Sequence, residues 1–168
     1  TLTTAQAVVS MLEVNGIDTL YCLPGVQNDP FFDALYDRTN AIRPIHARHE
    51  QACAYMALGH AMATGKPSAY VVVPGPGFLN TTAALSTAYA ANAPVFALTG
   101  QIQQSMIGRN IGQLHELPDQ LSIMRGLTKW ADRLRSPAEA PGMINEAFRR
   151  LLSGRQRPAQ RQARHRTK

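Results

Sequence analysis

This 168-residue sequence predicts an α/β protein with a doubly wound, mostly parallel sheet and helices on both faces. Segments with strand character alternate with segments with helix character along most of the chain, which is typical of that fold class. Residues 71–73 are three consecutive valines, an unbroken apolar run expected of a central parallel strand. Glycine turns follow several of the strands, and ligands of such sheets bind at the edge where the parallel strands end.

The N-terminal elements are assigned from caps and turn residues. A helix begins at Thr3 or Thr4, either of which can cap it, and Gly16 ends it. The first strand stops at Pro24-Gly25, and Asp29-Pro30 opens the second helix because proline suits a first helical turn. The expected helices cover residues 4–15, 29–36, 50–64, 79–91 and 136–152, and the expected strands cover residues 19–23, 42–48, 68–73, 94–99 and 127–134.

The later elements follow from composition and apolar spacing. Helix 50–64 carries small and apolar residues almost all round, so we expect it and the strand before it to be buried. A long, irregular, polar segment occupies residues 100–119, and the strand at 127–134 is less regular than the others. Ser136-Pro137 opens the last helix, whose apolar positions face inward.

The formal net charge of +6 comes entirely from the C-terminal end of the chain. Eight of the 17 Lys and Arg residues and none of the 11 acidic residues lie within residues 149–168, so nine basic and 11 acidic residues remain in the body. No aromatic stacking residues or recognisable module accompany the basic residues, and we therefore expect no nucleic-acid partner.

The cysteines and the hydropathy indicate a cytoplasmic protein. Cys22 and Cys53 have no metal-site or redox-motif spacing, so we expect two buried thiols in a reducing compartment and no metal site. The N-terminus lacks the pattern of a signal peptide. No run reaches the roughly 18 apolar residues that span a bilayer, and no membrane partner is expected.

Glu50 stands at the junction of the strand over residues 42–48 and the helix over residues 50–64. A carboxylate at a buried junction has little water to stabilise its charge, and it holds or shares a proton more readily than one in solvent. Taken alone, Glu50 fits better as a first-turn residue that interacts with the helix dipole.

Glycine turns are expected to lie near Glu50 at the same edge of the sheet. Residues 74–80 follow the most apolar strand and open a helix, and glycines there let a ligand approach the backbone. The segment is neither G-x-G-x-x-G, since Asn80 occupies the third glycine position, nor a Walker A loop. The turns at residues 23–28 and 99–101, and His115 in the polar segment, are each also consistent with purely structural or exposed positions.

Together the motifs resemble one family. R-H-E-Q-A at residues 48–52, V-V-P-G-P-G-x-x-N at 72–80 and P-V-x-A-L-T-G-Q at 94–101 occur in that order. They are similar to the pyrimidine-binding domain of thiamine-diphosphate enzymes of the acetolactate synthase and benzoylformate decarboxylase type, over residues 3–154. The resemblance implies the thiamine-diphosphate-binding fold and the N-terminal domain of an enzyme that decarboxylates or ligates 2-oxo acids.

The resemblance also implies roles for particular residues. Glu50 stands where the family has a glutamate that hydrogen-bonds N1′ of the cofactor's aminopyrimidine and shares a proton with it. Gln113 or His115 matches a polar active-site residue, although the spacing there departs from acetolactate synthase. The positions that line the aminopyrimidine pocket in the family are occupied here by Pro24, Gly25, Gly75 and Asn80.

The chain lacks the family's site for the diphosphate and Mg²⁺. That site uses a Gly-Asp-Gly motif followed by Asn-Asn, because a diphosphate requires a hard cation held by oxygen ligands, and this sequence has neither motif. In the family the site lies on a separate C-terminal domain, and the cofactor spans an interface between two chains. We therefore expect a homo-oligomer that needs the C-terminal diphosphate-binding domain, and an inactive isolated chain.

The C-terminal residues depart from the family pattern of a G-R-P-x-P-V turn and an apolar strand. The turn is recognisable at residues 154–158, but a polar and basic sequence follows it. We expect a pyrimidine-binding domain over residues 1–154, a sheet whose last strand is missing, and a disordered basic tail over residues 155–168. The missing strand would leave an unpaired edge and favour self-association.

Two other functions stay open. A non-catalytic interaction domain with the same fold is favoured by the basic tail and the missing half of the cofactor site. It is disfavoured by the presence of Glu50 and of the Gly-Pro-Gly loop. A Rossmann-type nucleotide-binding domain is disfavoured by Asn80 and by the lack of an acid placed for a ribose. The sequence does not distinguish between 2-oxo acids, or between decarboxylation and carboligation.

Overall fold

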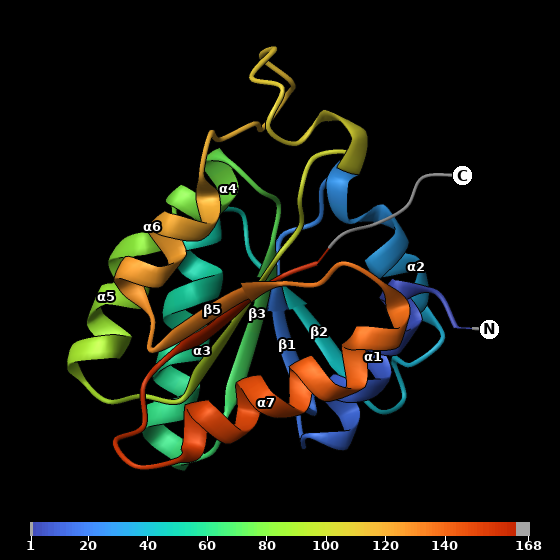
Figure 1. Cartoon of the computed structure of the whole chain (residues 1–168). Helices are drawn as coiled ribbons and strands as arrows, with labels where there is room; N and C mark the ends of the chain where they lie inside the picture. Colours follow the sequence, from blue (N-terminus) through green and yellow to red (C-terminus); the bar gives the residue numbers. More distant parts are fainter. Residues whose placement is uncertain (1, 164–168) are drawn as a thin grey trace.

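The computed structural model describes residues 2–163, which form one six-stranded parallel sheet with helices on both faces (Figure 1). The strand order is β2-β1-β3-β4-β6-β5, and the predicted fold class is confirmed. The strands are β1 (Thr19–Cys22), β2 (Arg43–His46), β3 (Ser68–Val72), β4 (Val95–Thr99), β5 (Trp130–Arg133) and β6 (Ala159–Gln162). The helices are α1 (Thr4–Val14), α2 (Asp29–Tyr36), α3 (Glu50–Thr64), α4 (Pro76–Leu79), α5 (Thr82–Ala90), α6 (Gln120–Leu127) and α7 (Ala140–Leu152).

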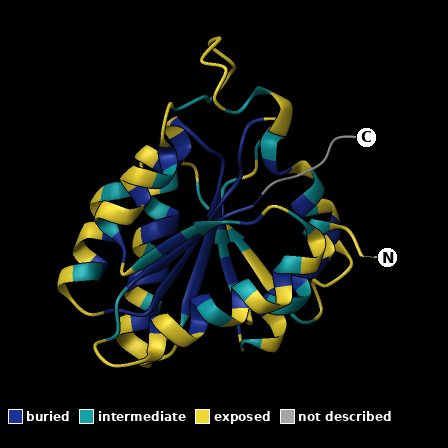
Figure 2. Ribbon diagram, viewed as in Figure 1, coloured by how far each residue is buried: buried dark blue, intermediate teal, exposed yellow. Residues whose placement is uncertain are grey.

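The core consists of two apolar layers, one on each face of the sheet. Alternate residues of β3 supply both layers because side chains of a strand point to opposite faces. Ala69 and Val71 join the cluster that includes α1, α2 and α7, whereas Tyr70 and Val72 join the cluster of α3, α5 and α6. Figure 2 shows the buried central strands enclosed by helices whose outer faces are exposed. Within residues 2–163 no helix is long and apolar enough to cross a membrane.

The strand predicted over residues 42–48 is shorter and more exposed than expected. β2 is the edge strand of the sheet, and Arg43, Pro44 and His46 are exposed. The prediction of a buried strand before Glu50 is therefore wrong, because position in the sheet and not local sequence decides how much of a strand is covered.

Two helical features differ from the prediction. The helix expected over residues 79–91 is α5, which begins only at Thr82, and the separate short helix α4 precedes it. Thr81 between them accepts a hydrogen bond from Tyr70 Oη (2.9 Å). Helix α6 was not predicted. Its cap is Asp119, whose side chain accepts a hydrogen bond from the backbone N–H of Ser122 (3.0 Å). The hydrogen bonds from Ser122 lower the pKa of Asp119, which favours the charged cap.

The prediction of a missing last strand is wrong. Residues 159–162, part of the predicted tail, form β6, which is inserted between β4 and β5 and pairs with both. Backbone N–H and C=O groups form such a ladder whatever the side chains are, so a polar sequence can occupy the position. The remainder of the predicted disordered tail, residues 164–168, lies outside the described residues.

Candidate functional site

The sheet has a topological switch point at β1. The chain passes from β1 to β2 on one side and then to β3 on the other side of β1. In parallel sheets the loops that leave the strands on either side of such a point diverge and leave a crevice for ligands. The loops at this place are residues 23–28 after β1 and residues 73–80 after β3, both predicted from the sequence as ligand-binding turns.

Glu50 lies beside the loop after β3. It is the first residue of α3, which His49 caps, and it is half-buried rather than buried as predicted, because the preceding β2 is an exposed edge strand. Glu50 Oε2 accepts a hydrogen bond from Asn80 Nδ2 (2.9 Å). Glu50 Oε1 would lie 3.4 Å from a Cβ atom on Gly77, so the carboxylate faces bare backbone of the loop. The structure thus brings Glu50, Gly77 and Asn80 together.

Val73 joins the two glycine turns. A Cβ atom on Gly25 would lie 2.5 Å from Val73 Cγ1, and a Cβ atom on Gly77 would lie 2.5 Å from Val73 Cγ2. Neither position therefore accepts a side chain without movement of Val73. Gly25 and Gly77 thus let both turns pack closely against the Val73 side chain.

Gly75 and His115 hold the long polar segment against the same loop. Gly75 has φ = 62°, and a Cβ atom there would lie 2.6 Å from the backbone oxygen of His115. His115 itself has φ = 69°, and its Nδ1 lies 3.0 Å from Gln27 Oε1 in the turn after β1. His115 thus contacts both glycine turns.

The polar segment is ordered by Glu116. Its carboxylate accepts hydrogen bonds from the backbone N–H groups of Asn110 (3.1 Å), Gly112 (2.8 Å) and Gln113 (3.0 Å). Gln113 is exposed, and its backbone N–H and C=O both form hydrogen bonds with Glu116. Of the two alternatives that the sequence left open, His115 lies at the glycine turns, and Gln113 belongs to the exposed part of the segment.

Gln120 is a site residue that the sequence did not indicate. It is buried at the start of α6, where its Oε1 accepts a hydrogen bond from the N–H of Gly75 (2.8 Å). Its Nε2 donates to Thr99 Oγ1 at the end of β4 (3.2 Å). Gln120 therefore fixes the backbone of Gly75 relative to the sheet. A glutamine in a polar stretch gives no local signal of this role, and α6 itself was not predicted.

Pro24 lies apart from these contacts. It is exposed and borders an apolar pocket of about 260 Å³ between α2 and the edge strand, lined also by Cys22, Phe32 and His46.

Burial raises the pKa of the Cys22 thiol to about 11, and burial also raises the pKa of the Cys53 thiol. Both thiols are free and buried, as predicted, and Cys22 is protonated at neutral pH. Within residues 2–163 no three His, Cys, Asp or Glu side chains are grouped to hold a metal ion.

Gly75→Ala tests the packing of the polar segment, with Gly108→Ala as its matched control. Both glycines have positive φ, but a Cβ atom on Gly108 would meet nothing within 4 Å. Both variants should lose about 1–3 kcal/mol of unfolding free energy to backbone strain. Gly75→Ala should lose more, because its new Cβ meets the backbone of His115. Equal losses in urea unfolding would contradict this close approach.

Comparison with known proteins defines the class of this chain. The family model "Thiamine pyrophosphate enzyme, N-terminal TPP binding domain" matches residues 2–123. The chain belongs to this family.

Its relatives include enzymes of two named activities. A probable acetolactate synthase large subunit of Methanocaldococcus jannaschii is 38% identical over 92% of this chain. A probable 2-ketoarginine decarboxylase of Pseudomonas aeruginosa is 34% identical over 94% of the chain, and the acetolactate synthase isozyme 2 large subunit of Escherichia coli is 37% identical over 92%. The chain spans only 25%, 28% and 27% of the lengths of these three relatives.

Proposed function

We propose that this chain binds the aminopyrimidine ring of thiamine diphosphate within an enzyme that decarboxylates or ligates 2-oxo acids. One observation carries the proposal: the Glu50 carboxylate faces the bare backbone of Gly77 at the switch point of the sheet. Family membership implies the cofactor, and relatives named as acetolactate synthases and a 2-ketoarginine decarboxylase indicate the substrate class.

The residues present fit the ring of this cofactor. Gly25 and Gly77 let both glycine turns pack against Val73, next to the Glu50 carboxylate that faces Gly77. Glu50 can share a proton with a ring nitrogen, and the hydrogen bond from Asn80 Nδ2 orients its carboxylate for that contact. His115 and Gln120 keep the surrounding loops in place. When bound, the cofactor supplies the electron sink for bond cleavage next to a carbonyl group.

The diphosphate end of the cofactor requires another domain. A dianionic diphosphate needs a hard cation held by oxygen ligands, and residues 2–163 contain no cluster that could hold one. We assign that role to the C-terminal diphosphate-binding domain of a complete enzyme, since this chain corresponds to about a quarter of its relatives' lengths.

Joining the chain to the C-terminal portion of a relative tests the proposed function. The joined protein should consume 2-oxo acids in a reaction that depends on thiamine diphosphate and Mg²⁺, whereas the chain alone should be inactive. Stable assembly with the C-terminal portion, cofactor binding and no turnover would instead support the alternative, a non-catalytic interaction domain.

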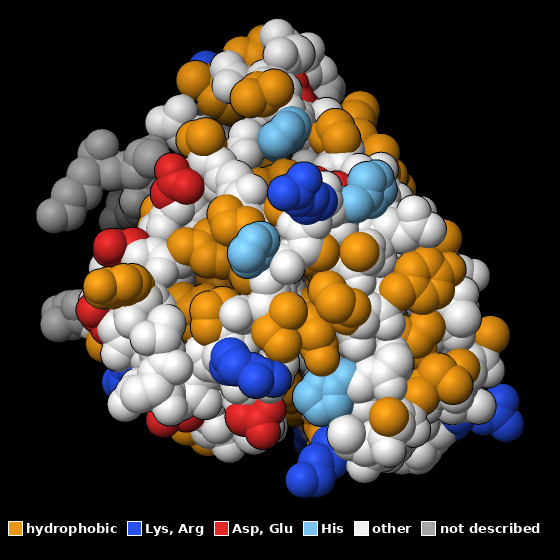
Figure 3. Space-filling view, turned by 180° about the vertical axis from the view of Figure 1, so that it is seen from behind, with side chains coloured by type: hydrophobic (Ala, Val, Ile, Leu, Met, Phe, Trp, Pro, Cys, Tyr) orange, Lys and Arg blue, Asp and Glu red, His pale blue; other side chains and the backbone are white. Residues whose placement is uncertain are grey.

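The chain should also self-associate through α3. Tyr55, Gly59 and Met62 are exposed along one side of this helix, with Tyr55 40% and Met62 63% accessible. Figure 3 shows hydrophobic side chains gathered on this side of the molecule. Size-exclusion chromatography should show dimers or larger species that dissociate on dilution, and Tyr55→Lys with Met62→Lys should give a monomer. A parent chain that elutes as a monomer across a wide concentration range would contradict this interface.

A further inference from the structure

The position of β6 is an apolar slot between two strands. On the β4 side its four residues pair in register with Phe96, Ala97, Leu98 and Thr99, and on the β5 side they begin opposite Trp130 and Ala131. One face of the slot is covered by the cluster of Phe96, Leu98 and α7, and the other by the cluster that contains Ala97, Ala131 and Met124. An alternation of apolar side chains would match both faces.

The strand that occupies the slot is polar. Gln160 lies between Ala97 and Ala131, and both polar atoms of its amide are buried without a hydrogen-bond partner among the described residues. Gln162 accepts a hydrogen bond from Arg133 Nε (2.6 Å), but its own Nε2 donates none to the described residues. Each buried polar group without a partner opposes burial of the strand.

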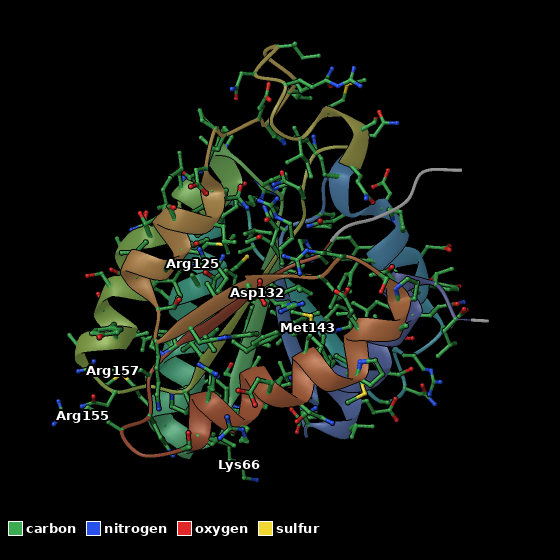
Figure 4. The ribbon with its side chains drawn as sticks, in the orientation of Figure 1. Lys66, Arg125, Asp132, Met143, Arg155 and Arg157 are labelled. Carbon is green, nitrogen blue, oxygen red and sulfur yellow. The ribbon has the colours of Figure 1, made fainter. Side chains whose placement is uncertain are left out.

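Arg161 is the least compatible residue of the strand. Its side chain has no exposed surface, and it lies between Leu98 and Asp132 in the ladder and against Met143 of α7 (Figure 4, with Asp132 and Met143 labelled). Its Nη1 is 3.8 Å from Asp132 Oδ2, and neither Nε nor Nη1 has a hydrogen-bond partner among the described residues. Its guanidinium carbon also lies 5.5 Å from the centroid of the Trp130 ring. A buried guanidinium whose Nε and Nη1 donate no hydrogen bonds to the described residues is still costly for the fold.

We propose that the slot between β4 and β5 is a binding site for an extended apolar segment of another polypeptide, in parallel register, and that β6 is its weakly held occupant. The backbone ladder holds β6 in place, while its side chains at positions 160–162 oppose burial. An apolar strand would form the same ladder and also bury side chains against both clusters, as in other cases of strand addition. β4 separates β6 from β1 and β3, the strands that the glycine turns follow, so the inference does not depend on the proposed function.

A synthetic peptide tests the proposal. It carries the sequence of residues 157–163 with valine, leucine and valine at the three central polar positions, and lysines at both ends for solubility. A control peptide keeps the native sequence. Trp130, the only tryptophan of the chain, pairs with Ala159 and reports on the slot. The apolar peptide should shift its fluorescence saturably and increase hydrogen exchange at the amides of residues 159–162, while the control peptide should do neither.

A variant chain with Gln160→Val, Arg161→Leu and Gln162→Val is the matched control. The apolar β6 of this variant packs against both clusters and competes with the peptide for the slot. The variant should therefore bind the apolar peptide at least about tenfold more weakly than the parent chain. No fluorescence change in the parent chain would overturn the proposal. Equal binding by parent and variant would overturn it as well, since the peptide would then bind outside the slot.

Discussion

Glu50→Gln should reduce 2-oxo-acid turnover by about 10²- to 10⁴-fold in a protein that joins this chain to a C-terminal diphosphate-binding portion. A glutamine has nearly the shape of glutamate, and its amide oxygen can still accept the hydrogen bond from Asn80 Nδ2. It cannot, however, take up and return a proton at a ring nitrogen. The variant therefore removes the proton transfer and keeps the packing.

Stability and a surface control separate this loss from misfolding. Glu50 is half-buried, and its hydrogen bond can be retained, so the thermal unfolding midpoint of Glu50→Gln should match that of the parent chain. Glu13→Gln changes a carboxylate that pairs with Arg38 on the surface (3.2 Å), and it should leave turnover unchanged. Turnover of Glu50→Gln within a factor of two of the parent would refute the catalytic role of Glu50.

The central part of the fold could be predicted because its signals are local. Residues 71–73 are apolar without interruption since β3 is covered on both faces, and the turn at Pro24-Gly25 follows β1 as expected. The alternation of helices and strands then restricts the topology to a parallel sheet. These signals required no knowledge of which residues are in contact.

The features that could not be predicted depend on neighbours distant in the chain. The exposure of β2 follows from its place at the edge of the sheet, and β6 forms because β4 and β5 offer paired backbone groups on both sides. The sequence of either strand taken alone indicates neither feature. The polar side chains of β6 disfavour a buried strand, but the strand forms because its backbone groups pair with those of both neighbouring strands.

In the candidate site, too, residues marked by local motifs could be predicted, and residues placed by distant contacts could not. The motifs identified Glu50, Asn80 and the glycine turns, which the structure brings to one edge of the sheet. The contact of Gln120 with the N–H of Gly75 joins residues 45 positions apart, and a single sequence holds no pattern for it. A motif thus indicates candidate ligand-binding residues more readily than the residues that hold those candidates in place.

Arg161→Leu should raise the free energy of unfolding by about 3 kcal/mol. Burial lowers the pKa of Arg161 to about 10, despite the opposing effect of Asp132, and a depression of this size corresponds to that free energy. Leucine would place an apolar side chain beside Leu98 and Met143 and remove the buried charge. Arg149→Leu is the control, because Arg149 is an exposed residue of α7 and should change stability by only about 0.5 kcal/mol.

The gain from Arg161→Leu should depend on pH in a defined direction. Arginine is a base, and its pKa is lower in the folded chain than in the unfolded chain, so its charge opposes folding. That penalty is complete below pH 10 and shrinks as the pH rises from about 10 toward the ordinary pKa of an arginine side chain. The difference between variant and parent in urea unfolding should therefore be larger at pH 7 than above pH 10. A variant no more stable than the parent at pH 7 would show that Arg161 is not a buried, poorly compensated charge.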